Sequence, residues 1–112
     1  MKRRASILNG CAYCIGLHTK DARKADESQQ RLYAVAAWHK APFFNQRERA
    51  ALALTDAVTL IADTHVPAAA YTRPRPISTP RSSPTCIWQI AAINAWNRIA
   101  VATRKTVGDY QP

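Results

Sequence analysis

The sequence Asn9-Gly10-Cys11-Ala12-Tyr13-Cys14-Ile15-Gly16-Leu17-His18 holds two thiols and one imidazole within eight residues. Spacings of three and four residues place side chains on one face of an α-helix, because a helical turn takes about 3.6 residues. We therefore expect Cys11, Cys14 and His18 to line one stripe of a helix over about residues 11–25. Asn9 is the expected N-cap of that helix.

Two neighbouring segments extend the helical pattern. Residues 1–8 are basic and then apolar, and they resemble the end of a helix. A helix is also expected over about residues 28–39, with Leu32, Val35 and Ala36 facing inward. It should stop before the following proline, because proline lacks an amide donor.

The C-terminal two thirds of the chain predict two longer helices. The sequence Asn45-Gln46-Arg47-Glu48 fits a capping box, in which Asn45 caps a helix over about residues 46–62 and Glu48 reaches back to the cap. The last helix covers about residues 86–104 and is apolar on nearly every face. A helix with that pattern requires burial on all sides, which in so short a chain predicts a subunit interface.

The composition supports an all-α fold. The chain has 112 residues, 47% of them hydrophobic, with many alanines and only three glycines. Alanine favours helices over strands, and a chain of this length builds one core. We predict a single domain over residues 1–112, with the three tryptophans in the core or in an interface. Asn94, Asn97 and Arg98 are expected to hydrogen-bond across that interface.

Residues 67–84 form an irregular, proline-rich stretch. It contains Pro67, Pro74, Pro76, Pro80 and Pro84. Because proline fixes φ and removes an amide donor, we predict an exposed loop with no ordinary helix.

The charge distribution argues against a nucleic-acid partner. The net charge is +9, but six basic residues lie in the first four positions and in the proline-rich stretch, and without them the net charge is +3. No apolar run approaches the roughly 20 residues that span a bilayer, and no signal sequence follows the basic start. We expect a cytoplasmic protein that binds neither nucleic acid nor membrane.

The Cys-x-x-Cys pair in a reducing compartment favours redox chemistry. A thiolate that attacks a peroxide becomes a sulfenic acid, which condenses with a neighbouring thiol to a disulfide. An external dithiol or protein reductant then restores both thiols. His18 lies about 6 Å along the helix from Cys14 and about 10 Å from Cys11, whereas the helix N-terminus favours a thiolate at Cys11. The spacing alone leaves open which thiol attacks.

Two other interpretations use the same residues. Cys11, Cys14 and His18 could bind zinc, with Cys86 or His65 as the fourth ligand, in a zinc-stabilised binding module. Alternatively, both cysteines are small core residues. His65 is also expected at the C-terminal end of a helix, where a cation is favourable.

Four stretches of the chain carry a family likeness. They are Arg4-Ala5-Ser6-Ile7-Leu8-Asn9-Gly10-Cys11-Ala12-Tyr13-Cys14, His18-Thr19-Lys20-Asp21-Ala22-Arg23, Arg47-Glu48-Arg49-Ala50-Ala51-Leu52-Ala53 and Ile93-Asn94-Ala95-Trp96-Asn97-Arg98. Together they resemble the alkylhydroperoxidase D-like branch of the carboxymuconolactone decarboxylase family, over about residues 4–66 and 87–108.

The resemblance implies an all-helical fold that forms a homo-oligomer, either a trimer or a hexamer, with thiol peroxidase activity on alkyl hydroperoxides. Carried over, Cys14 is the attacking (peroxidatic) cysteine, Cys11 resolves, and His18 joins a proton relay. No cofactor and no metal are implied. A non-redox, decarboxylase-like enzyme acting on a small lactone acid is the alternative within the same family.

The chain departs from the family pattern in two places. The family relay also uses a glutamate about twelve residues before the first cysteine, where this chain has not begun, and Glu48 is the candidate to replace it. Residues 68–84 stand where the family has a helix, and the likeness resumes near Ile87, as a pair of compensating frameshifts would produce. If these residues are instead authentic, the family's helix is lost and Cys86 is incidental.

Overall fold

The computed structural model describes residues 1–72, 82–108 and 110–112, and every regular element in these ranges is helical. The predicted all-α fold is therefore confirmed. The elements are α1 (Lys2–Leu8), α2 (Ala12–Lys24), α3 (Gln29–Ala34), the 3₁₀ turn η1 (Val35–Ala37), α4 (Gln46–Thr59), α5 (Ile61–Thr64), α6 (Ala68–Thr72) and α7 (Ser82–Ala102). Within the described ranges, no helix is long and apolar enough to cross a membrane.

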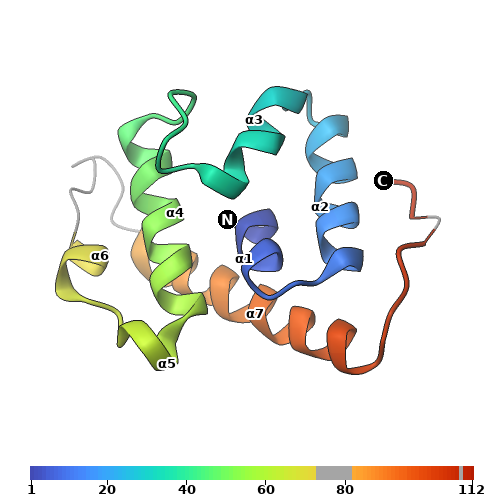
Figure 1. Cartoon of the computed structure of the whole chain (residues 1–112). Coiled ribbons are helices and arrows are strands. Elements are labelled where there is room, and N and C mark those ends of the chain that lie inside the picture. The colour runs from blue at the N-terminus through green and yellow to red at the C-terminus, as the bar shows by residue number, and fades with distance from the viewer. Residues whose placement is uncertain (73–81, 109) are drawn as a thin grey trace.

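The short helix α1 lies at the centre of the molecule. Figure 1 shows it between α2 and α4, with α7 crossing beneath, and it contacts all three. A helix of seven residues is not stable in isolation, because forming the first turn costs more free energy than so few hydrogen bonds recover. Its stability must come from the surrounding helices.

A buried ion pair joins α1 to α4. The Arg4 guanidinium donates from Nε and Nη2 to the two Asp56 carboxylate oxygens, at 2.7 and 3.0 Å. Its Nη1 donates to the Ala36 carbonyl at 2.7 Å, and the Trp38 indole donates to Asp56 at 3.1 Å. One charged pair thus connects α1, α4 and the segment around η1.

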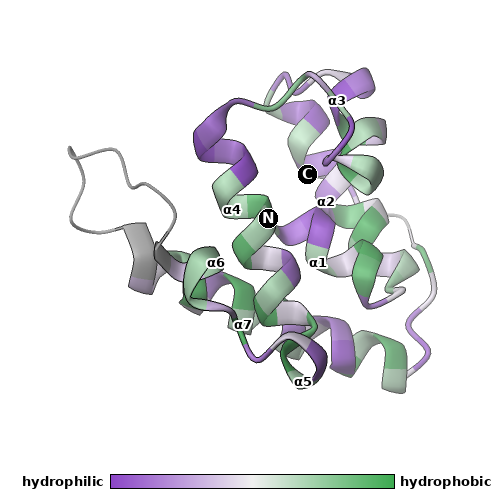
Figure 2. Cartoon of the chain, turned by 60° about the vertical axis from the view of Figure 1, so that its left-hand side comes forward, coloured by the Kyte–Doolittle hydropathy of each residue, from purple (hydrophilic) through white to green (hydrophobic). Residues whose placement is uncertain are grey.

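The capping box at the start of α4 is confirmed. The Asn45 side chain accepts from the Glu48 amide, and the Glu48 carboxylate accepts from the Asn45 amide. Glu48 also binds Arg31 of α3. Figure 2 shows that the hydrophilic starts of α3 and α4 lie at the same end of the molecule. Beside them, Phe44 packs into a cluster with Trp38, Ala41 and Leu52.

Two helices are shorter than the periodicity predicts. The helix expected over residues 28–39 ends at Ala34 and continues as the 3₁₀ turn, so Ala36 is exposed rather than buried. The helix expected over residues 46–62 ends at Thr59, and α5 follows as a separate turn that His65 caps with a φ of 51°. His65 therefore occupies the predicted C-terminal position.

The prediction that residues 67–84 contain no helix is wrong at both edges. Residues 68–72 form α6, and α7 begins at Ser82. Pro67 precedes α6 and Pro84 is the third residue of α7, where a helix tolerates proline because first-turn amides have no helical partner. The remaining part of the expected loop, residues 73–81, lies outside the described residues. These residues are also most of the segment 68–84 for which a frameshift is proposed.

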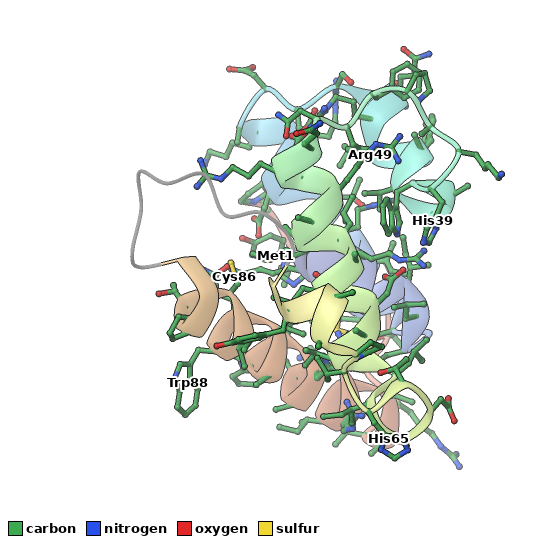
Figure 3. All side chains as sticks on the ribbon, turned by 90° about the vertical axis from the view of Figure 1, so that its left-hand side faces the viewer. Met1, His39, Arg49, His65, Cys86 and Trp88 are labelled. Atoms are coloured by element: carbon green, nitrogen blue, oxygen red, sulfur yellow. A yellow bond between two sulfur atoms is a disulfide. The ribbon has the colours of Figure 1, made fainter. Side chains whose placement is uncertain are left out.

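Helix α7 is buried along one face only. Ile90 and Asn97 are fully buried, whereas Trp88 and Trp96 are 75% and 64% exposed, and Trp88 points away from the ribbon in Figure 3. A core position for these two tryptophans is therefore wrong for the single chain, while Trp38 is in the core as predicted. Burial of the exposed face in an oligomer stays a prediction.

We expect Arg4→Met to lower the free energy of unfolding by roughly 2–4 kcal/mol, because it removes the cation from a largely buried pair and leaves an uncompensated carboxylate. Urea unfolding followed by circular dichroism measures the change. Arg47→Met is the matched control, since it removes one exposed charge from α4, the helix that carries Asp56. Equal stability of the two variants would show that the buried pair does not hold α1 in place.

Candidate active site

The two cysteines lie at the junction of α1 and α2. Helix α1 ends in a Schellman motif, in which the Cys11 amide donates to the Ser6 carbonyl at 2.9 Å and the Gly10 amide donates to the Ile7 carbonyl at 3.1 Å. Gly10 has a φ of +66°, a conformation that glycine adopts at little cost. The chain then turns directly into α2.

Cys11 is the N-cap of α2, so the prediction of Asn9 in that role is wrong. The Cys11 Sγ accepts a hydrogen bond from the Cys14 amide at 3.2 Å. Asn9 is instead the C-cap of α1, because the glycine after it completes the Schellman turn. Cys14 consequently lies in the first turn of α2, where free amides and the helix dipole favour negative charge.

Cys11 and Cys14 are joined as a disulfide, with their Cα atoms 5.3 Å apart. Both side chains are buried, at 2% and 5% exposure, and they pack with Ala100 of α7 and with Tyr13. The two sulfurs are therefore held at bonding distance by the backbone of one turn.

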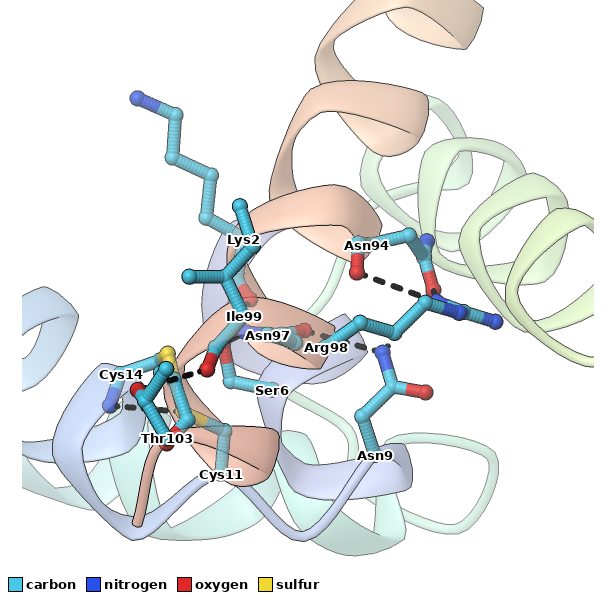
Figure 4. Close-up of a disulfide and its surroundings, with 11 residues drawn as sticks. Lys2, Ser6, Asn9, Cys11, Cys14, Asn94, Asn97, Arg98, Ile99 and Thr103 are labelled. Atoms are coloured by element: carbon cyan, nitrogen blue, oxygen red, sulfur yellow. Dashed lines mark hydrogen bonds between the residues drawn. A yellow bond between two sulfur atoms is a disulfide. The ribbon is translucent and has the colours of Figure 1, made fainter. Parts of the chain in front are cut away.

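A buried amide network anchors this junction to α7 (Figure 4). The Asn9 side-chain amide donates to the oxygens of Asn94 and Asn97, each at 2.9 Å. The Asn97 amide donates to the Ser6 hydroxyl at 3.0 Å, and the Asn94 amide to the Thr59 hydroxyl at 3.1 Å. The prediction that these asparagines pair across a subunit interface is therefore wrong, because both find partners within the chain.

Arg98 also finds its partner within the chain. Its guanidinium donates to the carbonyl and the side-chain oxygen of Asn94, at 3.1 and 3.0 Å. The Arg98 guanidinium therefore needs no hydrogen-bond acceptor from another subunit.

One pocket opens beside the disulfide, and we call it the thiol pocket. It has a volume of about 620 Å³, within the range of about 300–1,000 Å³ that is typical of ligand pockets. Its wall includes Cys14 and His18 of α2 but not Cys11. The apolar part of the wall comes from α2 and α7, and includes Leu17, Ile93, Trp96 and Ile99. Of the two cysteines, only Cys14 thus lines the pocket.

His18 is half-buried in the wall of this pocket. Burial lowers its pKa below the usual value, and the nearby positive charge of Lys2 lowers it further, while Asp21 acts in the opposite direction. The Asp21 carboxylate lies 3.8 Å from the His18 Nδ1 and accepts a hydrogen bond from the Tyr110 hydroxyl at 2.7 Å. A neutral imidazole can accept a proton from a neighbouring thiol.

The sequence matches a known family in the region that holds both cysteines and His18. Residues 1–57 match the profile of the carboxymuconolactone decarboxylase family. The chain belongs to the carboxymuconolactone decarboxylase family. The uncharacterised protein YdfG of Bacillus subtilis (strain 168) is 42% identical over 102 residues, which is 91% of this chain and 69% of YdfG.

A solved structure identifies the branch of the family. A protein of unknown function from Agrobacterium tumefaciens, provisionally described as the antioxidant defence protein AhpD, matches with a TM-score of 0.91 and 38% sequence identity. The match covers 97% of this chain and 75% of that protein. The chain therefore belongs to the AhpD-like branch, as its motifs predict.

The carboxylate nearest to His18 differs from the sequence-based candidate. Glu48 is occupied by the capping box and by Arg31, whose hydrogen bond lowers the pKa of Glu48. No hydrogen bond or ion pair joins the described side chains of Glu48 and His18, whereas Asp21 lies next to the imidazole. The spacing of three residues between His18 and Asp21 was the available signal, because such residues are neighbours on a helix.

The geometry does not favour the zinc-stabilised alternative. Cys86 lies beside Met1 near the start of α7 (Figure 3), whereas the disulfide packs on Ala100, about 20 Å further along this helix. Among the described residues, no group of three or more His, Cys, Asp or Glu side chains is placed to hold a metal ion. Cys86 is a free thiol remote from the pair.

We expect the reduced protein to be alkylated faster at Cys14 than at Cys11, because only Cys14 lines the thiol pocket. The measurement is a time course with iodoacetamide, read by mass spectrometry of the separate cysteine peptides from Cys11→Ser and Cys14→Ser variants. The half-buried Cys86 gives an internal reference in every sample. Faster labelling of Cys11 would contradict the assignment of Cys14 as the more accessible thiol.

Proposed function

We propose that the protein is a thiol peroxidase that reduces alkyl hydroperoxides in antioxidant defence. The observation that carries the proposal is the placement of Cys14 at a pocket beside a neutral His18, with Cys11 within bonding distance behind it. Membership of the AhpD-like branch and the description of the Agrobacterium relative support it. In this proposal Cys14 attacks, Cys11 resolves and His18 transfers the proton.

The first step transfers the terminal peroxide oxygen to sulfur. His18 accepts the thiol proton of Cys14, and the thiolate attacks the terminal oxygen, so that an S–O bond forms as the O–O bond breaks. The leaving alkoxide takes the proton from the imidazolium and departs as an alcohol. Sulfur supplies the two electrons, and Cys14 becomes a sulfenic acid.

The second step closes the disulfide. The Cys11 thiol attacks the sulfenic sulfur, the S–S bond forms, and the hydroxyl leaves as water. Because the Cα atoms are 5.3 Å apart in the disulfide, this step requires little backbone movement. An external dithiol or protein reductant then exchanges with the disulfide and restores both thiols.

Asp21 is the acid that we assign beside His18 in place of the family's relay glutamate. Its charge stabilises the imidazolium that forms while the thiol is deprotonated, and its bond to Tyr110 limits its motion. Asp21 is a positioning residue in this scheme, since it acts through His18.

We expect one equivalent of an organic hydroperoxide to remove two thiols from the reduced protein and leave a Cys11–Cys14 disulfide. Intact mass and a free-thiol count measure this, in a Cys86→Ser background that excludes the third thiol. Cys11→Ser should gain one oxygen as a trapped sulfenic acid, and Cys14→Ser should not react. If all thiols stay free, the redox proposal fails and a non-redox, decarboxylase-like activity replaces it.

We expect the pH dependence of hydroperoxide reduction to follow the ionisation of His18, with activity lost as the imidazole becomes protonated. Asp21→Asn removes an interaction that raises the His18 pKa, so the acidic limb should move to lower pH. Lys2→Met removes an interaction that lowers it, so the limb should move to higher pH. The measurement is kcat/KM against pH with the neutral tert-butyl hydroperoxide, and shifts in the same direction for both variants would contradict the assignment.

A further inference from the structure

We propose that the thiol pocket selects hydroperoxides that carry a carboxylate on a long apolar chain, and that Lys2 and Lys105 bind the carboxylate. The inference rests on the proposed peroxidase function and adds a substrate class to it. A fatty-acid hydroperoxide has the required combination of an anionic group, an alkyl chain and a peroxide.

The apolar wall of the pocket fits an alkyl chain. Trp96 and Ile99 line the pocket and are 64% and 53% exposed, so their apolar atoms face water in the isolated chain. An alkyl chain lying against them removes that surface from water, which is favourable by about 25 cal/mol for each Å² buried. Leu17 and Ile93 extend the same apolar wall.

Among the described residues, the charged side chains that line the pocket wall are basic. They are Lys2 and Lys105, and no described aspartate or glutamate lines it. A second pocket of about 560 Å³, which shares Lys2 and His18, is lined by both signs of charge: Arg3 and Arg31 face Asp21, Glu27 and Glu48 there. Of these two pockets, only the thiol pocket thus has described charged side chains of a single sign.

Both ammonium groups are available to an anion. Among the described residues, neither ammonium group makes a hydrogen bond or an ion pair, and the Lys105 Nζ lies over the Tyr13 ring, 4.9 Å from its centroid. An ammonium stacked on an aromatic ring keeps its N–H groups free for a carboxylate. The charge of Lys2 already reaches the catalytic histidine, whose pKa it lowers.

The carboxylate is not consumed in the reaction. Cys14 attacks the terminal peroxide oxygen, the O–O bond breaks, and a hydroxy acid leaves after it takes the proton from His18. The ion pair with the lysines holds the chain in the pocket so that the peroxide meets the sulfur. A neutral ester of the same hydroperoxide retains the apolar contacts and loses this ion pair.

The test compares linoleic acid hydroperoxide with its methyl ester as substrates of the full chain. We expect a higher kcat/KM for the acid, and a fall of about threefold to fivefold in the acid-to-ester ratio for Lys105→Met, as for a solvent-screened ion pair. Lys40→Met, an exposed lysine on the loop before α4, is the charge-matched control and should keep the ratio. The preference should also weaken as ionic strength rises. An equal ratio in wild type and Lys105→Met, or a preference for the ester, overturns the proposal.

A binding measurement separates this proposal from the peroxidase proposal. Dodecanoate and methyl dodecanoate are titrated into the oxidised protein while tryptophan fluorescence is recorded, with Trp96→Phe to identify the signal from the pocket. Tighter binding of dodecanoate than of the ester, with this difference lost in Lys105→Met, supports the anion site. This holds even if no hydroperoxide is turned over, in which case only the peroxidase proposal fails. Equal binding of acid and ester, or no binding of either, overturns the anion site even if tert-butyl hydroperoxide is reduced.

Discussion

The buried polar contacts of α1 are the constraint on which the rest of the structure depends. A seven-residue helix has too little apolar surface to stay in place by itself, yet it lies between α2, α4 and α7. Arg4 fixes it to α4 through Asp56, and Asn9 fixes its end to α7 through two asparagines. Buried polar groups are costly unless they are paired, so these contacts also exclude other positions for the helix.

The position of the redox pair follows from that anchor. Because Asn9 is held against α7, the next two residues must turn in a fixed place, and Gly10 supplies the left-handed conformation. Cys11 then ends one helix motif and begins the next, while Cys14 occupies the first turn of α2. The closeness of the two cysteines is thus a property of the helix junction.

Local signals in the sequence were sufficient for some features and insufficient for others. The capping box at Asn45 and Glu48 could be predicted because both partners lie within one turn. The cap at Cys11 could not, because Asn9 is an equally good candidate until the end of α1 is known. The exposure of Trp88 and Trp96 and the pairing of Asn97 with Ser6 depend on how α7 crosses α1, which no local pattern encodes.

The location of His18 explains how an apolar pocket can support proton transfer. This residue lines both the thiol pocket and the second pocket, where Asp21 and Glu48 also lie. A carboxylate inside the thiol pocket would repel both a thiolate and an anionic substrate, whereas the same charge behind the imidazole stabilises its protonated form. In the proposed mechanism, the imidazole therefore exchanges protons with the second pocket while the sulfur stays in apolar surroundings. Among the described residues, carboxylates line only the second pocket, so α2 can hold the thiol and its proposed base without placing an acidic group beside the sulfur.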